Sequence, residues 1–135
     1  MSSFKKNSPE IIQKGMELLN FVKISHLKDE SAGELSYGQQ KLLELARCLI
    51  SDPQIILLDE PTAGVNPTLI KEIVERIIEA NEKIGQTILI IEHNMDVLTD
   101  LAHRVYALNY GEVIAEGSME DIRQDTKVIE SYFGV

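Results

Sequence analysis

The strongest constraint on how this chain folds lies at residues 54–60, where the sequence QIILLDE leads from an apolar run into two adjacent acids. The uninterrupted run Ile55 to Leu58 predicts a strand that is buried on both faces, as the strands of parallel sheets are. Asp59 and Glu60 then stand at the carboxyl end of that strand, which in α/β sheets faces the crevice where ligands bind. Two carboxylates placed there are costly unless something positive meets them, so the segment predicts an α/β fold with a ligand site.

The remaining patterns alternate between helix and strand, the order that is typical of parallel sheets. A capping residue before proline predicts helix starts at Ser8-Pro9 and Asn66-Pro67. In chain order, the expected elements are a helix from Ser8, an irregular stretch over 23–33, a helix that ends before Pro53, the strand 54–58, a helix from Asn66 to Gly85, a second buried strand over 87–91, a short helix near 95–102, a hairpin over 104–117 and a helical segment from Ser118.

Length and charge narrow the classes of function. At 135 residues and 44% hydrophobic content, the chain has the size and composition of one globular domain. Its net charge of −9, with 13 scattered basic residues, argues against a nucleic-acid groove, because clustered Lys and Arg hold a phosphate backbone. The sequence has no apolar run near the roughly 20 residues that cross a bilayer. A role at a membrane would therefore depend on a partner protein.

The segment LSYGQQ, residues 35–40, has two interpretations. Ser36 and Gln39 fit a capping box, in which the serine oxygen accepts a backbone N–H and the glutamine side chain returns a hydrogen bond. Gly38 also leaves the first helical turn without a side chain. A helix start with bare N–H groups and a serine hydroxyl is suited to an anion such as phosphate, so capping and phosphate binding both remain open.

The two acids also have a structural and a functional interpretation. Asp-Glu-Pro would serve as a solvated turn after the strand. Alternatively, Asp59 would bind Mg²⁺, which prefers oxygen ligands and keeps several waters, while Glu60 polarises a water for attack on a phosphoryl group. His93 follows the second predicted strand in the same way. Because two strands in succession place polar residues at one end of the sheet, the functional interpretation gains weight.

Together these segments resemble the nucleotide-binding subunits of ABC transporters. LSYGQ at 35–39 looks like the signature sequence of that family, IILLDE at 55–60 like its Walker B strand and catalytic glutamate, AGVNP at 63–67 like its D-loop, and His93 like its switch histidine. Within the family, the resemblance is to the ATP-binding subunits of branched-chain amino-acid transporters, through the segments AGELSYGQQ, EPTAGVNP, IEHNMDVL, LNYGEVIAEG and ESYFG.

The resemblance implies roles for individual residues. Asp59 would hold the Mg²⁺ of the nucleotide through water, Glu60 would orient or deprotonate the attacking water, and His93 would contact the γ-phosphate. Asn66 of the D-loop stands where many members have aspartate, which puts a charged contact across the dimer in doubt, although this subgroup commonly has asparagine. The residues that would cap ATP held by the opposite subunit are Leu35, Ser36, Gly38 and Gln39.

The resemblance also implies the setting in which the protein works. Its cofactors would be ATP and Mg²⁺. Its partners would be a second ABC ATPase subunit, in a homodimer or heterodimer, and transmembrane permease subunits, with no nucleic acid. It would be cytoplasmic and peripheral on the inner face of the cell membrane.

The sequence lacks one part that the family requires. No run of the form G-x-x-G-x-G-K-[ST] occurs, although backbone N–H groups in such a loop cradle the phosphates. The resemblance thus covers one partial ABC domain, the second half of a family member: 1–34 as the end of the helical subdomain and a linker, and 35–135 as the rest. The expected fold is an incomplete P-loop NTPase of ABC type, with parallel strands and a terminal hairpin but no Walker A strand or loop.

We therefore expect a fragment of a longer protein, with very weak or absent ATP binding and a bare apolar edge at Thr87 to Ile91. The leading hypothesis is part of an ATPase that energises import of branched-chain amino acids. One alternative is a naturally short, non-catalytic ABC module that pairs with a complete subunit. Another is the ATPase of a lipid-export system.

Overall fold

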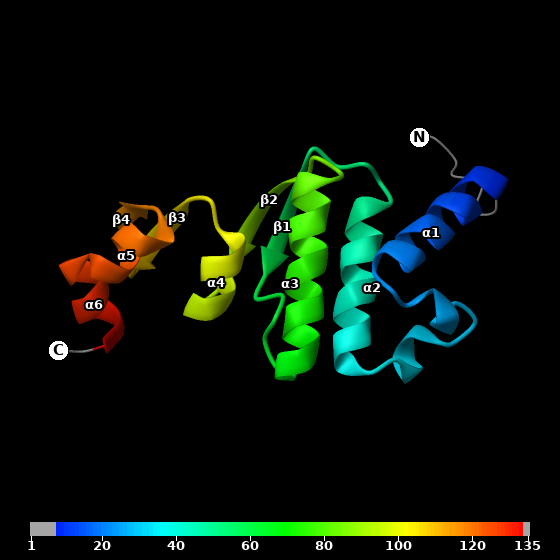
Figure 1. Ribbon diagram of the computed structural model, residues 1–135, viewed down its shortest axis with the longest axis horizontal. Helices are drawn as coiled ribbons and strands as arrows, with labels where there is room; N and C mark the ends of the chain where they lie inside the picture. The colour runs from blue at the N-terminus through cyan, green and yellow to red at the C-terminus, as the bar shows by residue number, and fades with distance from the viewer. Residues whose placement is uncertain (1–7, 134–135) are drawn as a thin grey trace. The chain divides into compact units, whose positions relative to one another are not determined.

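The computed structural model describes residues 8–133, and the chain divides into two compact units, Met1–Glu92 and His93–Val135 (Figure 1). The first unit begins with α1 (Pro9–Phe21), followed by two short 3₁₀ helices, η1 (Ser25–Leu27) and η2 (Ala32–Glu34). The start of α1 is confirmed, because the Ser8 hydroxyl accepts the N–H of Ile11 at 3.3 Å. No residue of α1 is buried, and the predicted irregular stretch contains both 3₁₀ helices.

The core of the first unit forms around α2 (Tyr37–Leu49) and α3 (Pro67–Glu82), which pack on each other. Each helix buries one apolar face in this core. The buried apolar residues are Leu42, Leu45, Ala46 and Leu49 of α2 and Ile73, Val74, Ile77 and Ala80 of α3.

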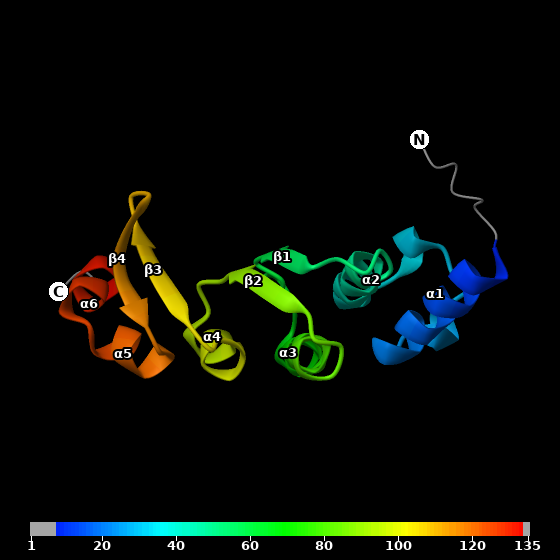
Figure 2. The ribbon, with the colours of Figure 1, turned by 90° about the horizontal axis from the view of Figure 1, so that it is seen from above.

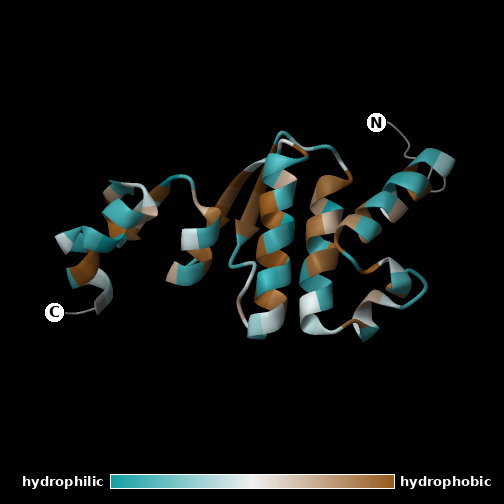
Figure 3. Ribbon diagram, in the orientation of Figure 1, coloured by the Kyte–Doolittle hydropathy of each residue, from teal (hydrophilic) through white to brown (hydrophobic). Residues whose placement is uncertain are grey.

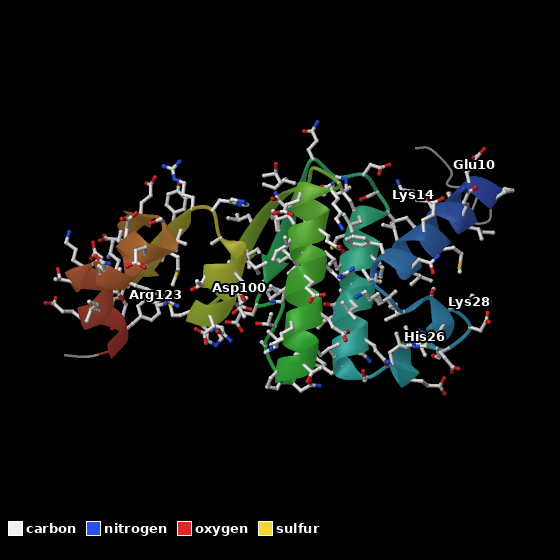
Figure 4. The ribbon with its side chains drawn as sticks, viewed as in Figure 1. Glu10, Lys14, His26, Lys28, Asp100 and Arg123 are labelled. Atoms are coloured by element: carbon white, nitrogen blue, oxygen red, sulfur yellow. The ribbon has the colours of Figure 1, made fainter. Side chains whose placement is uncertain are left out.

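Two side chains connect α1 to the elements that follow it. Lys14 of α1 pairs with Asp52, just beyond α2 (Figure 4). Arg76 of α3 is 8% exposed, donates to the carbonyl of Phe21 at 3.3 Å and pairs with Glu79 at 2.6 Å. A largely buried guanidinium therefore ties the end of α1 to the middle of α3.

The strands of the first unit are β1 (Ile55–Asp59) and β2 (Thr87–Ile91), which pair in parallel from Ile55 opposite Thr87 to Asp59 opposite Ile91. This confirms the strand–helix–strand prediction. In Figure 2, α3 lies beneath the pair. Within residues 8–133, β2 pairs with β1 alone, so the edge that was expected to be bare has no strand beside it.

The prediction that β1 is buried on both faces is wrong, and β2, which was predicted to be buried, is also exposed on one face. Ile56 is 3% exposed on the covered face, whereas Leu57 is 68%, Leu89 55% and Ile91 62% exposed on the other. Apart from Asp59 and Thr87, both strands are apolar (Figure 3). Their sequences therefore carry residues for two covered faces, while the described helices cover one.

The second unit contains α4 (Met95–Leu101), the antiparallel hairpin β3 (Val105–Asn109) and β4 (Glu112–Gly117), α5 (Met119–Gln124) and α6 (Thr126–Phe133). The hairpin turns at Tyr110 and Gly111, whose φ angles of +47° and +83° are those of a type I′ turn. Its core joins Ala107 to Ile122 of α5 and Val128 of α6.

The helical segment predicted from Ser118 is two helices. Asp125 is extended, and its carboxylate accepts the N–H groups of Lys127 at 2.8 Å and Val128 at 3.2 Å, so it begins α6 as α5 ends. Arg123 of α5 (Figure 4) donates to the hydroxyl of Thr99 in α4 at 2.8 Å. No helix within residues 8–133 combines the length and apolar character that crossing a membrane requires.

Candidate functional site

The two acids lie where β1 leaves the sheet. Asp59 is the last residue of β1 and is paired with Ile91, and the next N–H, of Glu60, donates to the carbonyl of Ile91 at 2.8 Å. Glu60 has a φ of +46°, in the left-handed region that residues other than glycine rarely adopt. Both acids are exposed. The strand therefore delivers two accessible carboxylates, the second on a backbone that the end of β2 helps to hold.

The turn after Glu60 is closed and partly buried. The N–H of Ala63 donates to the carbonyl of Glu60 at 3.1 Å, and Thr62 is only 4% exposed. Both the N–H of Thr62, at 3.2 Å, and its hydroxyl donate to one carboxylate oxygen of Glu92, the residue after β2. The end of β2 thus contacts the turn through side chain as well as backbone.

The start of α2 is a complete capping box. The Ser36 hydroxyl accepts the N–H of Gln39 at 3.4 Å, and the Gln39 side chain accepts the N–H of Ser36 at 2.9 Å. The carbonyl of Leu35 accepts the side-chain amide of Gln40 at 3.1 Å. The capping interpretation of Ser36 and Gln39 is confirmed, and their contact with a nucleotide stays a prediction.

Gly38 serves the packing of α2 on α3. A Cβ atom at this position would lie 1.6 Å from Cδ2 and 2.7 Å from Cγ of Leu69, so any other residue would force the leucine side chain to move. Leu69 lies in the first turn of α3. One side of the first turn of α2, which the sequence alone suggested was bare, is therefore occupied by Leu69.

The D-loop segment meets the start of α2 at a second point. Gly64 has a φ of +71°, and a Cβ atom there would lie 3.3 Å from Cε1 of Tyr37. Asn66 caps α3 by accepting the N–H of Leu69 at 3.1 Å. The structure thus brings the segments 36–39 and 64–69 together, although they were predicted as separate motifs.

A cavity of about 380 Å³ lies between α2, β1 and α3. Asp59 and the basic residues Lys41 and Arg47 line it, together with apolar side chains that include Leu57 and Ile77. Glu44 of α2 lines the cavity as well and pairs with Lys41 at 3.5 Å, so Asp59 shares the cavity with side chains of both charges.

His93 belongs to the second unit and is exposed. Along the chain it follows Glu92 directly, and the next residue, Asn94, caps α4 by accepting the N–H groups of Asp96 at 3.1 Å and Val97 at 3.3 Å. The structure therefore places His93 at the junction of β2 and α4, which is the position predicted for it along the chain.

The donor set suits Mg²⁺ better than a metal held by protein alone. Among the described residues, no three His, Cys, Asp or Glu side chains are grouped as a metal site would need. Mg²⁺ keeps several waters and is commonly bound through one or two carboxylates plus phosphate oxygens. The exposed carboxylate of Asp59 fits that requirement.

Sequence reasoning missed three residues that shape this site: Gln40, Thr62 and Glu92. Glu92 had a signal, because it is the polar residue that closes the apolar strand β2. Thr62 had none, since its role depends on a partner 30 residues away.

Two family descriptions match the chain. Residues 3–63 match the family "ABC transporter", and residues 112–135 match "Branched-chain amino acid ATP-binding cassette transporter". A probable branched-chain amino acid transport ATP-binding protein LivG of Archaeoglobus fulgidus is 43% identical over 96% of this chain and 50% of its own length. The high-affinity LivG protein of Escherichia coli K12 is 37% identical over 98% of this chain and 52% of its own length.

Solved structures of ABC transporter components are similar to this chain in fold as well as in sequence. The ADP conformation of MJ1267, an ATP-binding cassette of an ABC transporter, superposes with a TM-score of 0.87 at 39% identity, covering 99% of this chain and 54% of that one. The cbiO1 protein of Clostridium perfringens, part of the ABC transporter complex cbiONQ, superposes with a TM-score of 0.80 at 32% identity. The match covers 93% of this chain and 51% of that one. These matches confirm the resemblance and the fold class predicted from the motifs, and the chain spans about half the length of the relatives it matches.

Proposed function

The chain belongs to the ABC transporter family, and from this premise we propose that it is part of an ATP-binding subunit that hydrolyses ATP to energise import of branched-chain amino acids. The observation that carries the proposal is the turn at Asp59 and Glu60. It places two exposed carboxylates at the carboxyl end of a parallel strand pair, in a chain aligned over nearly its whole length with branched-chain amino acid transport proteins. This kinship favours amino-acid import over the lipid-export alternative.

In the proposed reaction, Asp59 would hold Mg²⁺ through water, and Glu60 would orient or deprotonate the water that attacks the γ-phosphate. His93 contacts that phosphate. Mg²⁺, when bound with ATP, supplies positive charge that offsets the charge of the phosphoryl oxygens. Glu60 has a left-handed backbone, whereas Asp59 belongs to β1, so the two acids stand on different backbone conformations.

The start of α2 is assigned to a second nucleotide. In this proposal Leu35, Ser36, Gly38 and Gln39 cap the ATP of a partner subunit, and Asn66 lies in the D-loop beside them. The N-terminal end of a helix favours an anion, which supports the assignment. The partners are a second ATPase subunit and transmembrane permease subunits at the inner face of the cell membrane.

We further infer that residues 1–135 form one partial ABC domain. The sequence contains no phosphate loop, so a loop for the nucleotide would have to come from a segment equivalent to the rest of the relatives' length. The isolated chain is expected to bind ATP very weakly or not at all. Isothermal titration with Mg-ATP checks this, and a dissociation constant near 1 μM, about −8 kcal/mol, would contradict it.

The decisive experiment replaces Glu60 by Gln in a protein that also carries the phosphate loop. Loss of a general base typically costs 10²–10⁴-fold in rate, so kcat should fall by about that factor while ATP binding is retained. Glu82→Gln, an exposed position at the end of α3, is the matched control. Phosphate release that survives Glu60→Gln would show that the assigned role is wrong.

A second candidate is the short, non-catalytic module, which the intact capping box at Ser36 and Gln39 favours. Such a module would offer only the start of α2 to a complete ATPase subunit. It predicts ATP-dependent co-purification with that subunit, together with turnover that is indifferent to Glu60→Gln.

A further inference from the structure

The side chain of Glu92 makes a contact that none of the roles above uses. One of its carboxylate oxygens accepts two hydrogen bonds from Thr62, one from the N–H at 3.2 Å and one from the hydroxyl. Thr62 is 4% exposed, so its hydroxyl requires a partner inside the protein. Hydrogen bonds to an ionised acceptor are stronger than those between neutral groups. The contact therefore fixes the turn after β1 to the end of β2.

This turn is the one that carries Glu60. The φ of +46° at Glu60 is a strained conformation for a residue other than glycine, and it persists only where the surroundings determine it. The N–H of Glu60 donates to the carbonyl of Ile91 at 2.8 Å, and the carbonyl of Glu60 accepts the N–H of Ala63 at 3.1 Å. Two consecutive residues, Ile91 and Glu92, thus hold the turn on both sides of Pro61.

We propose that Glu92 is a positioning residue, which holds the backbone of Glu60 in its left-handed conformation through Thr62. The proposal rests on the function proposed above only for its effect on turnover. Its structural part, that Glu92 sets the conformation of residues 60–63, stands on the hydrogen bonds alone. A displacement of about 1 Å at a reacting group can cost about 10²-fold in rate, so a loosened turn should slow turnover strongly.

The test uses the protein that carries the phosphate loop, with variants graded by how much of the contact they keep. Glu92→Ala removes the acceptor, and Thr62→Val removes the hydroxyl donor but keeps the N–H. Glu92→Gln keeps an oxygen acceptor without its charge, and Thr62→Ser keeps the hydroxyl donor without the methyl group. Thr99→Val is the matched control, because it removes a hydroxyl of the second unit that accepts a hydrogen bond from Arg123 at 2.8 Å.

The expected result is a 10–100-fold fall in kcat for Glu92→Ala, a smaller fall for Thr62→Val and near-complete retention for Thr62→Ser, with KM for ATP unchanged throughout. The double variant Glu92→Ala/Thr62→Val should turn over no more slowly than Glu92→Ala, because both changes remove the same interaction, that between Thr62 and Glu92. A merely structural role would instead lower the amount of active enzyme and leave the turnover of the folded fraction unchanged, which active-site titration detects.

Amide hydrogen exchange of Glu60 and Thr62 separates this inference from the proposed function. Exchange at both amides should accelerate at least tenfold in Glu92→Ala and stay unchanged in Thr99→Val. Unchanged exchange in Glu92→Ala would overturn the inference, whatever the rate of ATP hydrolysis. If the wild-type protein hydrolyses no ATP while Glu92→Ala shows the accelerated exchange, the proposed function is overturned and the role of Glu92 in the turn stands.

Discussion

Each unit contains a two-stranded sheet, yet the two pairs are joined in opposite ways. β3 and β4 meet through the two-residue turn at Tyr110 and Gly111, so their register is set by neighbours in the sequence. β1 and β2 are joined through α3, and their register depends on packing and on contacts such as that of Thr62 with Glu92. The site acids lie in the unit whose sheet depends on contacts distant in sequence.

The comparison extends to the outer faces of the sheets. Leu57 and Ile91 are 68% and 62% exposed in the parallel pair, and Leu108 and Val113 are 54% and 58% exposed in the hairpin. Antiparallel sheets commonly leave one face to water, whereas parallel sheets are nearly always covered on both. The open face of β1 and β2 is therefore the more unusual of the two.

The largest predicted effect tests whether the two cores are separate. Ile77→Ala removes a residue that is 3% exposed in the first unit, and should cost about 2–5 kcal/mol in unfolding free energy. Val128→Ala, at a residue 2% exposed in the second, is the matched change. Hydrogen exchange should accelerate in β1 and β2 for the former and in β3 and β4 for the latter. Equal acceleration in both units would mean that they unfold as one.

A smaller effect is expected where α2 meets α3. Gly38→Ala forces Leu69 to move and should lower the free energy of unfolding by about 1–3 kcal/mol. Gly15→Ala in α1 is the control, because the nearest atom to its Cβ would be 4.0 Å away and alanine favours the helix by about 0.5–1 kcal/mol. Urea titrations of both variants decide the point. Equal stability of Gly38→Ala and wild type would show that Leu69 can move aside without loss of packing.

The smallest predicted effect is a difference in pH dependence between the capping box at the start of α5, Ser118 with Asp121, and that at the start of α2, Ser36 with Gln39. Hydrogen bonds from the hydroxyl and N–H of Ser118 lower the pKa of Asp121 below its ordinary value of 3.8. Its stabilising contribution is thus present above pH 3.8 and is lost as the pH falls through the lowered pKa. The equivalent residue of the α2 box, Gln39, does not titrate.

The measurement is the difference in unfolding free energy between wild type and variant across pH. For Asp121→Asn, the difference should shrink in acid, whereas for Gln39→Ala it should stay constant. A pH-independent difference for Asp121→Asn would contradict the assigned hydrogen bonds.

What could be predicted from the sequence follows the same division between local and distant contacts. The caps at Ser8 and Ser36 and the turn after Asn109 were predicted because each depends on residues within one turn of chain. The exposed face of β1 was not predicted, because an apolar run does not reveal how many layers cover it. The break at Asp125 was missed for a local reason, since its cap lies inside a helical pattern.

The site shows this division most clearly. Asp59, Glu60 and His93 were found because each lies at or just after the end of an apolar strand. Thr62 and Glu92 were not recognised as partners, because the hydrogen bonds between them join separate strand ends. The motif letters indicate which groups to propose as reacting, and the hydrogen bonds around those groups emerge only from the folded chain.

The fit of Leu69 against Gly38 has an evolutionary consequence. The two positions share one volume, so a side chain can grow at position 38 only if the one at position 69 becomes smaller. Across related proteins, alanine or serine at position 38 should occur with valine or alanine at position 69, because residues in contact covary. The double replacement Gly38→Ala/Leu69→Ala would then recover part of the packing that Gly38→Ala loses. The two positions are therefore expected to change together in evolution.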